Sequence, residues 1–142
     1  MMTTKISSKL LRVAMLAFVS LGLSSLEASA DQHMKDGTIP NLIGTWSGKN
    51  NTISDKKGYL TRDKTIEITE QKDRRFKGIF KYAEGTVKFF GVIYPDNLSF
   101  TWVSEGSRGY NQGRILGKSK ISACYVESGI DATAGCAELT RQ

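Results

Sequence analysis

The sequence predicts an all-β protein, an antiparallel up-and-down barrel of eight strands. Short segments alternate between apolar and polar residues with a period of two, and turn-forming residues separate them. From residue 42 onward, no window carries the apolar stripe at i, i+3, i+4 and i+7 that an amphipathic helix needs. Nearly every connection is short, which favours pairing in chain order, and closing such a sheet into a barrel removes its exposed edges.

The expected strands follow one another from residue 44 to residue 141. Alternation is clearest in 65–71, where Ile66 and Ile68 share one face. Residues 86–94 are apolar on both faces, which favours a central strand or one that covers a partner surface. The expected segments are 44–50, a weaker one at 52–54 or 59–61, then 65–71, 76–82, 86–94, 98–103, 110–116, 121–126 and 134–141.

Residues 1–30 are typical of a secretory signal peptide that precedes the barrel. Lys5, Lys9 and Arg12 give a positive start, a mostly apolar core follows at 10–23, and Ala28-Ser29-Ala30 supplies the small residues of a cleavage site. The alternative is a retained membrane anchor, which needs about 20 mostly apolar residues. The short core, interrupted by Ser and Gly, favours cleavage.

Cleavage after residue 30 leaves an extended lead-in at 31–41 and a barrel domain at 42–142. It removes three basic residues and one acidic residue, so the net charge falls from +6 to +4. We expect a periplasmic or secreted bacterial protein with no stable membrane insertion after cleavage. This modest charge, the strand number and export argue against binding to nucleic acid.

The two cysteines predict a disulfide. Cys124 and Cys136 are the only pair in a chain that is expected to be exported to an oxidising compartment. The single histidine, His33, lies in the lead-in, and two thiolates do not complete a tetrahedral zinc site. We therefore expect neither a metal nor a cofactor.

An antiparallel hairpin with the two cysteines opposite each other has a defined register. It pairs Ala123 with Ala137 and Ile121 with Leu139, which places these apolar side chains on the face opposite the disulfide. The same parity carries Arg141 inward at the end of the last strand. A charged side chain that faces the interior needs a partner.

The ends of the expected barrel carry a resemblance to a known superfamily. Gly44-Thr45-Trp46 near the first strand and Leu139-Thr140-Arg141 in the last one resemble the ends of the calycin-like barrels, namely lipocalins, fatty-acid-binding proteins and avidin-like proteins. The resemblance implies that Trp46 closes one end of the barrel and that Arg141 packs across its ring. It does not extend to biotin binding, because the later tryptophan-rich strands of avidin-like proteins have no counterpart here.

Ligand binding inside the barrel is the function that the sequence favours. Aromatic walls with a few polar groups are common in small-molecule sites, so we expect a small apolar or aromatic ligand. The alternative is a lumen that side chains simply fill. No nucleophile motif or phosphate-binding loop is present, so we expect no enzymatic activity. The candidate lumen residues are Phe80, Tyr82, Phe89, Phe100, Trp102 and Tyr125.

A second hypothesis is binding to a protein through the lead-in or the loops at the barrel rim. The chain also resembles small periplasmic inhibitors of secreted metalloproteases, whose N-terminal tail enters the protease cleft. That resemblance implies a role for 31–40, where His33 could approach a metal. The outward apolar residues Phe90, Val92 and Tyr94 could instead form a contact between copies of the chain.

Overall fold

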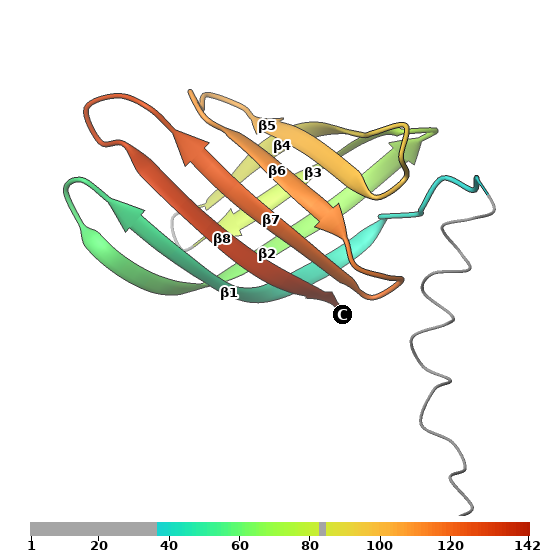
Figure 1. Ribbon diagram of the computed structural model, residues 1–142, viewed down its shortest axis with the longest axis horizontal. Coiled ribbons are helices and arrows are strands. Elements are labelled where there is room, and N and C mark those ends of the chain that lie inside the picture. Colours follow the sequence, from blue (N-terminus) through green and yellow to red (C-terminus); the bar gives the residue numbers. More distant parts are fainter. Residues whose placement is uncertain (1–36, 83–84) are drawn as a thin grey trace, which may run out of the picture.

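The computed structural model describes residues 37–82 and 85–142, which form a closed barrel of eight antiparallel strands in chain order (Figure 1). The prediction of an all-β up-and-down barrel is therefore confirmed. Within the described residues, no helix is long and apolar enough to cross a membrane. The signal peptide at 1–30, most of the lead-in and His33 lie outside the described residues. The strands are β1 Gly44–Ser54, β2 Gly58–Lys72, β3 Arg75–Tyr82, β4 Gly85–Ile93, β5 Ser99–Ser104, β6 Tyr110–Ile115, β7 Lys120–Glu127 and β8 Thr133–Arg141.

The first hairpin is longer and more regular than the sequence predicts. The expected segments at 52–54 and 59–61 are continuous parts of β1 and β2, which pair without interruption from Gly44↔Ile68 to Ser54↔Gly58. The backbone N–H of Lys57 donates to the Ser54 hydroxyl, and Gly58 adopts a φ of +62°, so the polar residues between the strands form one tight turn. The strands of this hairpin look shorter in the sequence, because charged and polar residues on their outer face interrupt the apolar alternation.

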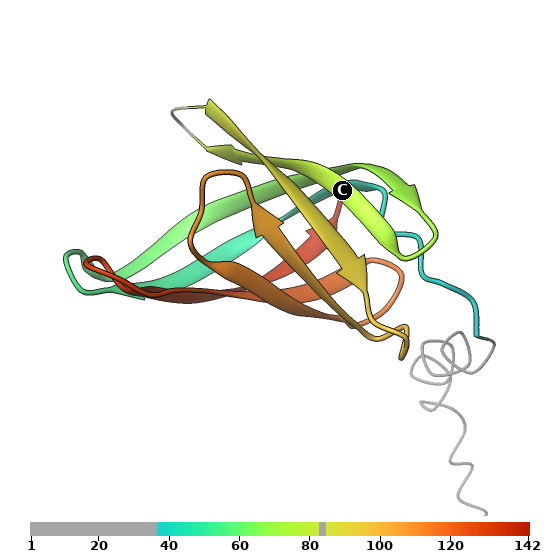
Figure 2. The same ribbon diagram turned by 90° about the horizontal axis from the view of Figure 1, so that it is seen from above.

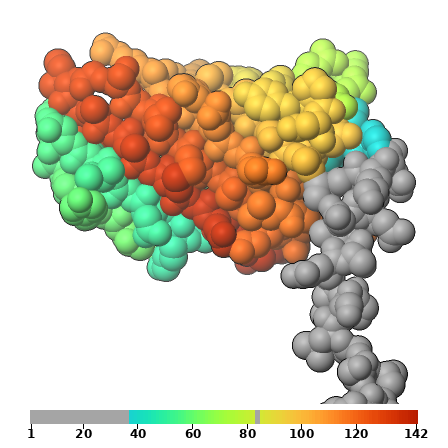
Figure 3. All heavy atoms as spheres, in the orientation of Figure 1, coloured from blue at the N-terminus to red at the C-terminus, as the bar shows by residue number. Residues whose placement is uncertain are grey.

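The last hairpin has the register that opposed cysteines imply. Cys124 and Cys136 are paired between β7 and β8 and form a disulfide on the outer face. On the inner face Ala123 and Ala137 are buried as a cross-strand pair. Figure 3 shows these strands (red and orange) running diagonally across one face of the molecule, with β1 (green) on one side.

We predict that removing this disulfide destabilises the barrel without changing its fold. Closing a loop with a sequence separation of 12 lowers the entropy of the unfolded chain, so the double change Cys124→Ser and Cys136→Ser should lower the free energy of unfolding by about 3 kcal/mol. Urea unfolding of the oxidised protein and the double variant measures the difference. An unchanged midpoint and slope would show that the disulfide contributes nothing to stability.

Aromatic side chains fill one half of the lumen. Several inward-facing positions are glycine, and at Gly78, Gly91 and Gly113 a ring from the neighbouring strand occupies the space. A Cβ atom at Gly91 would lie 2.3 Å from the Phe76 ring, and one at Gly113 would lie 2.2 Å from the Phe100 ring. The Phe76 and Phe100 rings meet edge to face with centroids 6.1 Å apart. This half of the barrel is a packed core.

Trp46 and Arg141 close the end of the barrel next to this core. The Arg141 guanidinium lies 4.2 Å from the centre of the Trp46 ring, which is fully buried. Arg141 also donates to the carbonyl oxygens of Asn41, Ile43 and Lys118. The view in Figure 2 shows the chain segment before β1 (cyan) and the end of β8 (red) at the same side of the barrel. Arg141 thus ties the last strand to the segment that precedes the first.

Candidate functional site in the barrel lumen

The structure divides the six candidate lumen residues between two halves of the barrel. Phe89 and Phe100 are fully buried members of the packed core. Trp102 also belongs to this core, where it stacks on Phe100 with ring centroids 5.4 Å apart. Phe80, Tyr82 and Tyr125 lie toward the other half. Phe80 and Tyr82 stack with centroids 5.7 Å apart, and Tyr82 is 43% exposed although it faces inward by strand parity, so solvent reaches the lumen face at this end of β3.

Lys64 on β2 crosses this second half of the lumen. Its residue exposure is only 8%, and its ammonium nitrogen lies 5.8 Å from the centre of the Phe80 ring and 5.7 Å from that of Trp102. Within residues 37–82 and 85–142, no hydrogen-bond acceptor or carboxylate pairs with it. Lysine is rarely buried without such a partner. The Lys64 ammonium therefore contacts only the rings of Phe80 and Trp102 among the groups described that can stabilise a positive charge.

Burial changes the acidity of this group. Desolvation lowers the pKa of Lys64 from 10.5 to about 8, because a buried ammonium loses its hydration. Near neutral pH the Lys64 side chain is therefore still charged, and its buried charge lowers the stability of the folded protein. Any bound group with a negative charge would offset that cost.

A row of inward-facing polar and aromatic residues continues from Trp102 across the lumen wall. The cross-strand pairs run from Trp102 to Asn111, from Asn111 to Tyr125 and from Tyr125 to Gly135, which in turn pairs with Thr52 on β1. Asn111 is buried. Directly opposed residues have Cβ atoms about 5 Å apart, so these side chains are neighbours. We call this set, together with Lys64 and Phe80, the polar lumen site.

One further polar atom in this half has no partner. The Asn50 amide nitrogen donates to the Thr52 hydroxyl at 2.8 Å, but the Asn50 Oδ1 atom is buried and accepts no hydrogen bond within the part of the chain that the structure describes. A buried acceptor without a partner is costly. Asn50 and Lys64 are diagonal neighbours between β1 and β2, so a donor and an acceptor without partners lie close together.

The hydroxyl of Tyr125 is already engaged at the mouth of the site. It donates to a carboxylate oxygen of Glu127 and lies 3.0 Å from the Ser107 hydroxyl. Burial and the bond to Glu127 raise the pKa of Tyr125. Tyr125 and Glu127 therefore act as a fixed polar wall, and the Glu127 carboxylate is paired locally.

Lys64 is the residue that sequence reasoning missed. It stands in the charged stretch Arg62-Asp63-Lys64, which is typical of a solvated face. The signal that could have found it is parity, because Lys64 shares the inward face of β2 with Ile66 and Ile68, both buried. Among the described residues, no group of three or more His, Cys, Asp or Glu side chains is placed to hold a metal ion.

Comparisons with known proteins add little to this geometry. No protein-family model matches the chain, and no curated protein matches it. A redesigned β-barrel matches 71% of this chain and 91% of its own, with 13% identity and a TM-score of 0.44. An S-type phycobiliprotein lyase, CPES from Guillardia theta, matches 79% and 92%, with 8% identity and a TM-score of 0.40. Similarity at this level carries no inference about function, so an avidin-like or lipocalin relationship stays a prediction.

Proposed function

We propose that this chain is an exported, non-catalytic binding protein that holds a small carboxylic acid with a planar apolar body in the polar lumen site. The observation that carries the proposal is Lys64, a buried ammonium between two aromatic rings with no acceptor among the described residues. Export rests on the signal-peptide pattern of residues 1–30.

The chemistry of the site selects this class of ligand. A carboxylate would accept charge-assisted hydrogen bonds from Lys64 and neutralise the buried charge. The stacked rings of Phe80 and Tyr82 suit a planar apolar body, and the buried amide of Asn111 offers a further donor. The expected apolar or aromatic ligand thus gains an acidic group, which the sequence did not predict.

Benzoate and its neutral analogue benzamide test the proposal. The chain has two tryptophans, so its ¹H–¹⁵N NMR spectrum holds two indole signals. We expect benzoate to shift the Trp102 signal saturably at pH 6.5. The Trp46 signal should stay in place, because its indole N–H donates to the Leu42 carbonyl oxygen at the closed end. Benzamide should bind at least tenfold more weakly, since a charge-assisted hydrogen bond contributes about 1.5–3 kcal/mol.

Two variants complete the test. Lys64→Gln should weaken benzoate binding at least tenfold, whereas Lys57→Gln in the exposed β1–β2 turn should leave it unchanged. Binding to the native protein should also weaken as the pH rises above about 8, because Lys64 loses the proton that the carboxylate needs. A Trp102 signal that does not move, or equal binding by the Lys64→Gln variant, would refute the proposal.

A further inference from the structure

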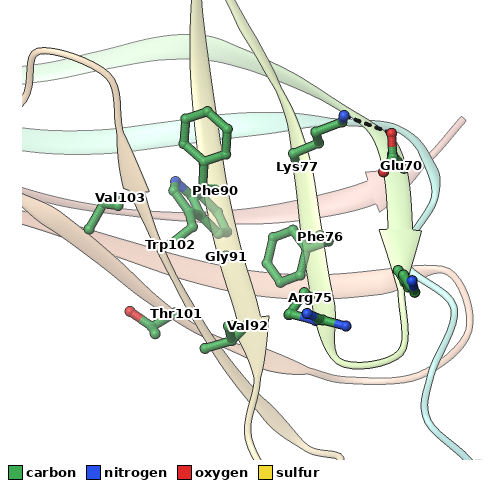
Figure 4. A pocket seen from close by; sticks show the side chains of 11 residues that line it. Glu70, Arg75, Phe76, Lys77, Phe90, Gly91, Val92, Thr101, Trp102 and Val103 are labelled. Carbon is green, nitrogen blue, oxygen red and sulfur yellow. Dashed lines mark ion pairs between the residues drawn. The ribbon is translucent and has the colours of Figure 1, made fainter.

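A groove with a volume of about 590 Å³ lies on the outer face of the barrel, over β2–β5 (Figure 4). Its centre is apolar and is formed by Phe90 and Val92 of β4 and Val103 of β5. Phe90 and Val103 are a cross-strand pair, and each is 52% exposed. The groove is therefore an accessible apolar surface on the outside of the barrel, and Trp102 of the polar lumen site also contributes to its lining.

The apolar surface continues beyond the groove across the neighbouring strands. Val103 pairs with Tyr110 on β6, and Tyr110 pairs with Val126 on β7. All of these side chains point outward and are more than 40% exposed. We call Phe90, Val103, Tyr110 and Val126 the outer apolar row. A continuous exposed row of this kind is characteristic of an interaction surface, whereas isolated apolar side chains are common on any protein.

The rim of the groove is positively charged. Lys72, Arg75 and Lys77 line it together with a single carboxylate, Glu70. Glu70 pairs with Lys77 at 2.7 Å. Arg75 reaches Asp73 only at 3.4 Å in an exposed geometry, and no ion pair to Lys72 is present among the residues that the structure describes. Exposed pairs of this kind are weak, so an incoming carboxylate can compete for the rim.

Elsewhere the outer face differs from the groove. Cross-strand ion pairs join Lys49 to Asp63 on β1 and β2 and Lys120 to Glu138 on β7 and β8, although no ion pair to Lys88 or Arg114 is present among the described residues. At the groove, an excess of positive charge lies directly beside an exposed apolar centre. A ligand that complements this surface has an apolar side chain for the centre of the groove and carboxylates for its basic rim.

We propose that the groove is a docking site for a segment of another protein that inserts one aromatic or aliphatic side chain and places acidic residues against Lys72 and Arg75. The hollow suits a protruding anchor residue, which is the usual hot spot of a protein interface. A symmetric contact between two copies would set the same cations against each other, which disfavours a second copy of this chain. The proposal is independent of the ligand in the lumen.

Three short peptides of matched length test the proposal by ¹H–¹⁵N NMR. The first has tryptophan flanked by glutamates, the second has tryptophan flanked by lysines, and the third has glycine flanked by glutamates. We expect only the first to cause saturable shifts, centred on the backbone signals of Phe90, Val92 and Val103. The double variant Lys72→Glu and Arg75→Glu should weaken this binding at least tenfold, while Lys57→Glu changes it less than twofold.

A second substitution separates the apolar contribution from the charge. Phe90 is half exposed, so Phe90→Ser should leave folding intact and still abolish the saturable shifts. Shifts that are absent with all three peptides, or that are insensitive to the charge reversals, would overturn the proposal. It would also be overturned by binding to phosphatidylglycerol vesicles without peptide binding, which would assign the groove to a membrane surface, or by a concentration-dependent doubling of the molecular mass, which would assign it to a second copy.

Discussion

Replacing Lys64 by Met should raise the free energy of unfolding of the ligand-free protein at pH 7 by about 3 kcal/mol. The pKa of Lys64 falls from 10.5 to about 8 in the folded state, and each unit corresponds to about 1.4 kcal/mol of lost stability while the group stays charged. Methionine has a similar length and carries no charge, so it removes that cost and still contacts Phe80 and Trp102.

The pH dependence of stability provides the control for this prediction. Because the unfolded chain retains the Lys64 proton between pH 8 and 10.5 and the folded chain does not, the native protein should gain stability as the pH rises through this window. Below pH 8 the cost is present in full. The Lys64→Met variant should lack this rise, and Lys57→Met should retain it. Urea unfolding at pH 7 and pH 9.5 measures both, and a Lys64→Met variant less stable than the native protein at pH 7 would contradict the prediction.

Replacing Trp46 by Ala should lower the free energy of unfolding by about 4 kcal/mol. The ring is fully buried, so the change leaves a large cavity. It also removes the contact with Arg141 and the hydrogen bond to the Leu42 carbonyl oxygen, which together close this end of the barrel. The measurement is thermal or urea unfolding. Tyr59→Ala, at a position that is 88% exposed, is the matched control and should change stability by less than about 0.5 kcal/mol. A loss below about 1 kcal/mol at Trp46 would show that the end of the barrel is held by other contacts.

The barrel could be predicted from the sequence because its strands obey a simple alternation. The opposed cysteines fix the last hairpin, and the observed partners of Ala123 and Ile121 are those that the pairing implies. The first hairpin was less clear, because outward charges such as Asp63 hide the continuity of β2. The local sequence pattern therefore predicts the order of the strands well and their lengths less well.

The site was harder to predict because side chains from different strands form it. The sequence shows aromatic residues with inward parity, but it does not show which of them fill the core, as Phe89 does, and which stay accessible to solvent, as Tyr82 does. Lys64 becomes a candidate binding residue only because its ammonium lies beside the rings of Phe80 and Trp102, which are on β3 and β5. A contact of this kind depends on the closure of the barrel and leaves no signal in the spacing of residues.

The most direct test of the account is the titration of the Lys64 side chain by NMR, first in the ligand-free protein and then with saturating benzoate. If the ammonium binds a carboxylate, linkage requires benzoate to raise the pKa of Lys64 from about 8 toward the ordinary value for lysine of 10.5. We predict that upward shift. The same midpoint with and without benzoate would contradict the claim that Lys64 binds an acidic ligand.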